Sequence, residues 1–127
     1  MGYFKWSLRI EREQKKNYIT ICRKIRKKLE KDGWIKKADE DMAWDHSLAL
    51  SVAWMCHLSI EVVSSPMNLK IMARKANLRK GERCIIPVEE LINSFNCWDK
   101  KDEYIMWLDK WFDRSEWTTL TTPIDVN

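Results

Sequence analysis

Glycine, histidine and long apolar runs are scarce in this sequence, and each shortage argues against a class of function. The chain of 127 residues has three Gly and no glycine-rich phosphate-binding motif, which excludes P-loop and dinucleotide-binding sites. It has two His and no C-x-x-C pair, so the short ligand spacings of a zinc site are missing. No uncharged run reaches the roughly 20 residues of a membrane span. We therefore expect a non-enzymatic protein with no metal, no cofactor and no membrane contact.

The N-terminal residues and the cysteines indicate the cellular compartment in which the protein is expected. Residues 1–10 have neither the apolar run nor the small-residue cleavage site of a secretion signal. Without such a signal, the cysteines are expected to be reduced and the protein to be cytoplasmic. A catalytic dyad of residues distant in sequence, for example a Cys and a His, is left open by this composition. The cysteines are Cys22, Cys56, Cys84 and Cys97.

Eight Trp residues in a chain of this length stand out from an otherwise ordinary composition. Hydrophobic residues make up 45% and charged residues 33%, as in a single globular domain, here residues 1–127. Large rings fill the core of a small domain, or they form a binding surface, because Trp anchors interfaces and stacks on bases. Several of the Trp residues stand at helical spacing beside other apolar residues. This favours the core for most of them.

An uncharged run from His46 to Ile60 stands between Asp45 and Glu61. At 100° per residue its apolar side chains cover nearly the whole circumference, which is typical of a buried helix. We therefore predict a central helix over residues 42–63, around which the other helices pack. The two His of this helix are eleven residues apart, or roughly 16 Å along its axis, so one metal ion could not bind both.

The strongest helical periodicity covers residues 14–31, and Asp32-Gly33 is a typical helix end. Residues 3–10 alternate between apolar and polar, which slightly favours a strand over a helix. The buried stripe predicted for residues 14–31 is Tyr18, Ile21, Cys22, Ile25 and Leu29.

The second half of the chain predicts shorter elements. Pro66 and Pro87 suit helix starts, which gives helices from 66 to about 77 and from 87 to about 95. A last helix is expected over residues 99–113, with Tyr104, Leu108, Trp111 and Phe112 as its buried stripe. A short strand is expected at 84–86, and residues 117–122 form a closing strand or an ordered tail.

The fold class that follows is mainly α. It is a compact helical domain of four to five helices around a buried central helix, with a short N-terminal strand and a minor β-hairpin as further elements.

The charges of the chain are segregated into four blocks, although its net charge is only +4. Residues 1–37 carry a net +9 and residues 38–69 a net −5, and residues 70–83 carry +5 before the last block returns to −5. Two basic blocks that met on one face would attract a polyanion more strongly than the net charge suggests.

The outer face of the helix over residues 14–31 is the best electrostatic feature of the sequence. Its cations fall in one arc, and Glu30 lies near the edge of that arc. An ordinary solvated helix face is the alternative, but such faces usually mix signs. The candidate phosphate contacts are Lys16, Arg23, Lys24, Lys27 and Lys31 from this helix and Lys70, Arg74, Lys75, Arg79, Lys80 and Arg83 from the second basic block.

The segment from Arg79 to Phe95, with a basic turn followed by I-P-V-E-E-L, is similar to the strand-proline-helix end of excisionase-type winged DNA-binding domains. The likeness covers 17 of 127 residues and implies phosphate contacts by Lys80 and Arg83. Those domains also contain a compact helix-turn-helix, whereas one long helix is expected here over residues 42–63.

Two functional hypotheses remain open, and nucleic-acid binding is slightly favoured. In the first, the basic helix faces bind phosphates of DNA or RNA, provided that both basic segments share one face. In the second, the chain is a protein-binding adaptor or inhibitor of the kind found in phages and other mobile elements, acting on a host protein such as a nuclease complex. The basic face then meets an acidic protein surface, and the acidic segment 98–117 presents Trp98, Trp107 and Trp117 as anchors.

Overall fold

The structure of the protein is a computed structural model. It describes the backbone of residues 2–75, 86–115 and 117–121 and, within these ranges, the side chains from Arg9 onward. The fold is mostly helical with one small two-stranded antiparallel sheet, which agrees with the mainly α class predicted above. The elements are α1 (Gly2–Lys31), β1 (Met42–His46), α2 (Leu50–Met55), α3 (Ile60–Val63), the 3-10 helix η1 (Pro66–Asn68), β2 (Leu69–Ala73), α5 (Val88–Asn96), α6 (Lys101–Trp111) and α7 (Trp117–Thr121).

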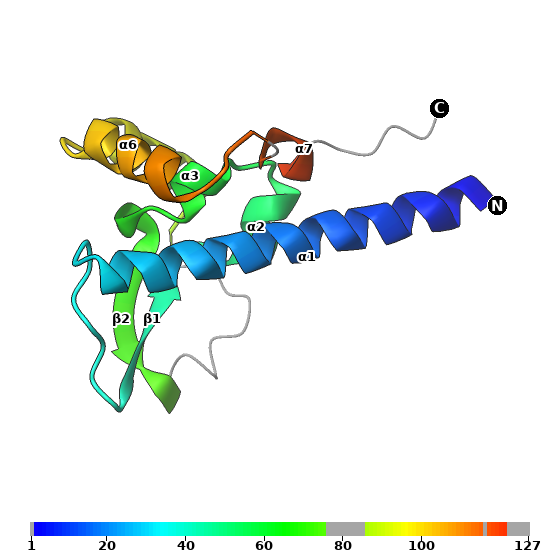
Figure 1. Cartoon of the computed structure of the whole chain (residues 1–127). Coiled ribbons are helices and arrows are strands. Elements are labelled where there is room, and N and C mark those ends of the chain that lie inside the picture. The colour runs from blue at the N-terminus through cyan, green and yellow to red at the C-terminus, as the bar shows by residue number, and fades with distance from the viewer. Residues whose placement is uncertain (1, 76–85, 116, 122–127) are drawn as a thin grey trace.

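Helix α1 runs across the molecule, and α2, α3 and α7 pack against it (Figure 1). Its first turns extend beyond the other elements. The helix predicted over residues 14–31 is confirmed as part of α1. The fully buried side chains of the stripe recur every three or four residues, as expected when one helix face lies on a core. They are Tyr18, Cys22, Ile25 and Leu29.

A glycine closes α1, as the sequence predicts. Gly33 has φ +84, in the left-handed region that a residue without Cβ adopts at low cost. The Trp34 N–H donates to the Leu29 carbonyl at 2.9 Å, and the Gly33 N–H donates to the Glu30 carbonyl at 3.4 Å. These are the two bonds of a Schellman motif, and they turn Trp34 back onto the core.

The prediction of a strand over residues 3–10 is wrong, because α1 already begins at Gly2. Alternation over so few residues fits a helix as well as a strand. A strand needs a partner strand to satisfy its backbone groups, whereas a helix satisfies them within its own segment.

The prediction of one central helix over residues 42–63 is also wrong. That segment contains β1, α2 and α3. His57, with φ +57, ends α2, and the Leu58 N–H donates to the Ala53 carbonyl at 3.0 Å in a second Schellman motif. Because His57 is neither Gly nor Asn, the sequence carries no signal for this left-handed residue.

Strands β1 and β2 pair antiparallel, with Met42 opposite Ala73 and His46 opposite Leu69. The helix predicted from residue 66 to 77 is therefore wrong, since η1 and β2 occupy residues 66–73. Figure 1 shows the two strands projecting from the side of the molecule opposite α6.

The helices of the C-terminal third agree with the sequence prediction more closely. Helix α5 follows Pro87, and α6 lies within the predicted range 99–113. Residues 117–121 form the helix α7, and not the closing strand that was one of the two alternatives for this segment. The strand expected at 84–86 involves residues that fall, apart from Ile86, outside the described part of the chain.

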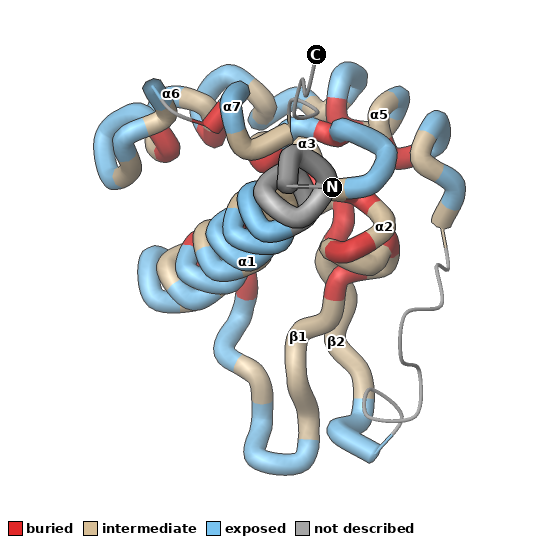
Figure 2. The backbone as a smooth tube through the Cα atoms, turned by 90° about the vertical axis from the view of Figure 1, so that its right-hand side faces the viewer, coloured by how far each residue is buried: buried red, intermediate tan, exposed pale blue. Residues whose placement is uncertain are grey.

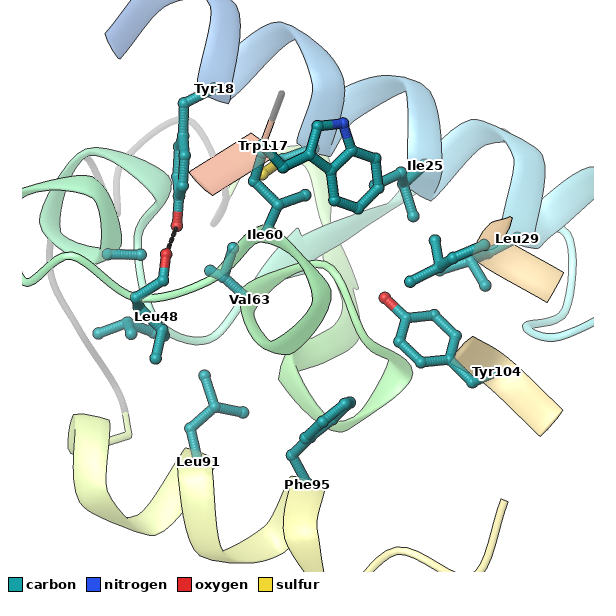
Figure 3. Close-up of a cluster of buried hydrophobic side chains, with 14 of the residues drawn as sticks. Tyr18, Ile25, Leu29, Leu48, Ile60, Val63, Leu91, Phe95, Tyr104 and Trp117 are labelled. Carbon is teal, nitrogen blue, oxygen red and sulfur yellow. Dashed lines mark hydrogen bonds between the residues drawn. The ribbon is translucent and has the colours of Figure 1, made fainter. Parts of the chain in front are cut away.

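The core surrounds α3, with α1 on one side and α5 and α6 on the other (Figure 3). Two tyrosine hydroxyls that point into it donate to backbone carbonyls. The Tyr18 hydroxyl donates to the Leu58 carbonyl at 2.7 Å, and the Tyr104 hydroxyl donates to the Glu61 carbonyl at 2.8 Å. Two of the largest buried side chains therefore connect α1 to the loop before α3 and α6 to α3 itself.

Most Trp residues belong to this core, as predicted. Trp117 is buried, and five further Trp side chains are partly buried against the core cluster. Many of their rings join an aromatic network centred on Tyr104, with ring centroids about 5.5 to 6.5 Å apart. The partly buried five are Trp34, Trp44, Trp54, Trp98 and Trp107.

The buried thiol of Cys22 predicts a loss of stability in alkali. Burial raises its pKa to about 12, whereas an unfolded chain ionises Cys near pH 8.5. The protonated Cys22 thiol contributes fully to the free energy of unfolding below about pH 8.5. This contribution is lost as the pH rises toward 12, because only the unfolded state then releases the proton. The unfolding free energy of the wild type should therefore fall as the pH rises from about 9 to 10. In urea unfolding over this range, we expect the unfolding free energy of Cys22→Ala to fall less steeply, by about 1 kcal/mol per pH unit.

Cys97→Ala, which removes an exposed thiol, is the matched control and should keep the wild-type slope. Burial also raises the pKa values of Tyr18 and Tyr104, so the wild-type slope should steepen further above about pH 10. Equal slopes for wild type and Cys22→Ala would contradict the assignment to Cys22.

Candidate nucleic-acid interface

The five cations predicted on the first basic helix all lie on the exposed side of α1. Their positions follow the spacing of three, four and seven residues that places side chains on one helix face. Figure 2 shows this side of α1 exposed over most of its length. The basic face of α1, as we call it below, consists of Lys16, Arg23, Lys24, Lys27 and Lys31.

The charges of the basic face are not neutralised within the described part of the chain, where none of the five side chains forms an ion pair. Lys28, on the flank of α1, differs because its Nζ lies 3.2 Å from a carboxylate oxygen of Asp32. From Lys16 to Lys31 the face is about 22 Å long at 1.5 Å per residue. Arg12 extends it by one turn, and Glu13 is the exposed acid beside it.

The second basic segment lies beside acidic residues. Lys70 stands directly opposite Asp45 in the β1–β2 register, and the Arg74 N–H donates to the Asp41 carbonyl at 3.1 Å. Arg74 and Lys75 are exposed at the far end of the strand pair. The described contacts of this segment are thus with residues 41–46, and none of them joins it to the basic face of α1. Arg79, Lys80 and Arg83 fall outside the described residues.

The three Trp residues proposed as partner anchors take part in the aromatic network to different degrees. Trp117 is 5% exposed and lies in the core, so it is not available as a surface anchor. Trp98 and Trp107 are half-buried, and the Trp107 ring stacks on Tyr104 with centroids 6.1 Å apart. The Trp107 indole N–H donates to Asp32 at 2.8 Å, and this hydrogen bond lowers the pKa of that carboxyl.

Trp111 is the exposed Trp that the sequence prediction placed in the buried stripe of α6. It is 48% exposed, while Tyr104 and Leu108 of the same stripe are fully buried. Helix α6 ends at Trp111, and the chain turns into extended backbone at Phe112, which packs on Trp117 with centroids 6.3 Å apart. Phe112 and Trp117, and not Trp111, therefore pack into the core at this end of α6.

Trp111 lies beside α1. The Lys28 Nζ is 3.9 Å from the centroid of its ring, and the Lys110 Nζ is 5.1 Å away. Ammonium groups at these distances are attracted by the negative face of the indole ring. An exposed aromatic ring thus stands next to cations at the C-terminal half of the basic face.

A groove of about 340 Å³ opens between α1 and α7. Its lining combines apolar side chains with the Asn17 amide, the Thr20 hydroxyl and the ammonium of Lys24, which also belongs to the basic face. Arg114 holds the segment before α7 in place, since it donates to Glu61 at 3.0 Å and to Asp109 at 2.7 Å. The residues that line the groove are Asn17, Thr20, Ile21, Lys24, Asp113, Trp117 and Leu120.

A second groove, of about 440 Å³, lies near the C-terminal end of α1 and the start of α6. Two indole rings and three carboxylates line it, together with one lysine. Its charge is opposite to that of the basic face. The lining residues are Asp32, Gly33, Trp34, Pro66, Met67, Trp98, Asp99, Lys100 and Glu103.

Among residues 2–75, 86–115 and 117–121, no group of three His, Cys, Asp or Glu is placed to hold a metal ion. None of the helices in this described part of the chain is long and apolar enough to cross a membrane. Comparisons with protein-family models, curated proteins and solved structures find no match to the chain.

Proposed function

We propose that this non-enzymatic protein binds nucleic acid through the basic face of α1. The observation that carries the proposal is that five cations share one exposed helix face and none of them is paired within the described residues. A face of this kind attracts phosphates by charge and releases the counterions condensed on them.

Phosphate contacts explain affinity but give little sequence specificity. The proposal rests on α1 alone, because the described part of the second basic segment lies beside Asp41 and Asp45. Lys16, Arg23, Lys24, Lys27 and Lys31 are the proposed phosphate contacts, whereas Lys70, Arg74 and Lys75 are left out of the binding face.

The test is a binding titration of the purified full chain, followed by fluorescence anisotropy. The probes are a labelled DNA strand of about 20 nucleotides, its duplex and an RNA strand of the same sequence. We expect at least one probe to bind with a dissociation constant of about 10 μM or less at low salt. If none of the three probes binds, the proposed function is wrong.

Protein binding is the second candidate, and the groove around Trp34 and Trp98 favours it. Asp32, Asp99 and Glu103 surround these rings, and such a site suits a Lys or Arg side chain of a basic partner. The test measures binding of an arginine-rich peptide to wild type and to Trp98→Ala. Equal affinity for both proteins would argue against this candidate.

A further inference from the structure

We infer that the nucleic acid bound by the basic face is single-stranded, with one unpaired base stacked on Trp111 and another held in the groove between α1 and α7. This inference rests on the proposed function and adds the kind of nucleic acid. It comes from the placement of an exposed ring and a half-apolar groove along the same flank of α1.

Trp111 presents an exposed ring with cations beside it. Trp111 is 48% exposed, whereas the other Trp residues with described side chains are buried or partly buried. Lys28 and Lys110 place ammonium groups within about 5 Å of the ring. A nucleotide offers a flat base and a phosphate together, and the two match an aromatic ring with cations beside it. An ammonium displaced by the stacking base can pair with that phosphate.

The groove between α1 and α7 lies on the same flank of α1 as Lys28. Asn17, Thr20, Lys24 and Lys28 are three or four residues apart, so they share one flank of α1. The groove occupies this flank from Asn17 to Lys24, and Lys28 with Trp111 continues it one turn further. A cavity of about 340 Å³ is at the lower end of the range for small-ligand pockets and has room for a base.

The lining of the groove suits a base better than a phosphate. Ile21 and Leu120 offer apolar surface, and the Asn17 amide can both donate to and accept from a base edge. Asp113 can accept from an exocyclic amino group. Hydrogen bonds from Ser115 lower the pKa of this carboxyl, so it is ionised at neutral pH and would repel a phosphate.

A duplex cannot use these two features, because its bases are stacked and paired inside the double helix. An unpaired strand can turn its bases toward Trp111 and the groove, while its phosphates lie along Lys24, Lys27 and Lys31. The arrangement therefore favours a single strand over a duplex of the same length.

The experiment compares wild type, Trp111→Ala, Trp111→Phe and Asn17→Leu for binding to the labelled single strand and to its duplex at one low salt concentration. We expect Trp111→Ala to lower single-strand affinity by about 5- to 150-fold, the range measured for one base–aromatic stack, and to leave duplex affinity unchanged. Trp111→Phe should restore part of the loss because it keeps an aromatic face. Asn17→Leu should lower single-strand affinity by about 2- to 12-fold.

Met106→Ala is the matched control, since Met106 is a 72% exposed apolar residue of the same helix. It should bind both probes like wild type. If wild type binds both probes but Trp111→Ala weakens neither, or weakens both equally, the inference is wrong while the proposed function stands. If wild type binds neither probe, the proposed function fails and the inference falls with it.

Discussion

Replacing both Lys24 and Lys27 with glutamate is expected to weaken nucleic-acid binding by on the order of 10- to 100-fold at low salt. The two side chains are exposed near the middle of the basic face and have no ion-pair partner within the described residues. The substitution removes two phosphate contacts and places two carboxylates where phosphates would lie. Each lost phosphate contact also makes the slope of log K against log salt concentration less negative. The slope should therefore become shallower by about 1.4 for a single strand and about 1.8 for a duplex.

Arg74→Glu/Lys75→Glu is the matched control because it changes the net charge by the same amount. These side chains are exposed at the end of the strand pair, beside Asp41. We expect this variant to keep most of the wild-type affinity. A loss as large as that of Lys24→Glu/Lys27→Glu would show that overall charge, and not the basic face of α1, controls binding.

Asn68→Ala is expected to lower the free energy of unfolding by about 3 kcal/mol or more. Asn68 is fully buried, and its side chain accepts from the Leu48 N–H at 2.7 Å and donates to the carbonyls of Leu48 and Val63 at 3.2 and 2.9 Å. Alanine leaves these backbone groups without their partner in a buried site, and each such group costs about 1–3 kcal/mol. The measurement is urea unfolding at neutral pH, followed by circular dichroism.

Asn96→Ala is the control for this prediction, since Asn96 is exposed at the end of α5. Its side chain accepts only a long bond of 3.4 Å from Lys101 among the described contacts. We expect its unfolding free energy to lie within about 0.5 kcal/mol of wild type. Similar losses for the two variants would contradict the assigned role of Asn68 in joining the start of α2 to α3 and β2.

The elements that could be predicted from the sequence are those that depend on nearby residues. The stripe from Tyr18 to Leu29 repeats at helical spacing, and Gly33 supplies the left-handed end. Pro87 before α5 and the apolar spacing within α6 are equally local signals. For the same reason, the exposed cations of α1 could be named before the structure was known.

The elements that could not be predicted depend on residues far apart in sequence or on an unusual conformation. Met42 pairs with Ala73, and no local pattern indicates that pairing. The uncharged run that suggested one helix is broken by His57, which has the left-handed conformation that only a few per cent of non-glycine residues adopt. An apolar run tells only that a segment is buried, and it fits a buried strand with two short helices as well as one long helix.

In the candidate site, too, the features that depend on nearby residues could be predicted, and those that depend on distant residues could not. Helical periodicity correctly predicted that the basic face is exposed. The same periodicity, applied up to the last residue of α6, wrongly predicted that Trp111 is buried. The groove between α1 and α7 depends on packing between residues about 100 positions apart, such as Gln14, which donates to the Thr119 carbonyl at 2.7 Å. No sequence window contains both sides of such a contact.

The most direct test of the central claim is the salt dependence of binding by the wild-type protein. Affinities for the single strand and the duplex are measured by anisotropy from about 50 to 400 mM salt and plotted as log K against log salt concentration. Five phosphate contacts by the basic face predict straight lines with slopes of about −3.5 for the single strand and about −4.5 for the duplex. Binding that is absent, or that stays constant across this range of salt, would contradict the claim that the basic face of α1 binds nucleic acid.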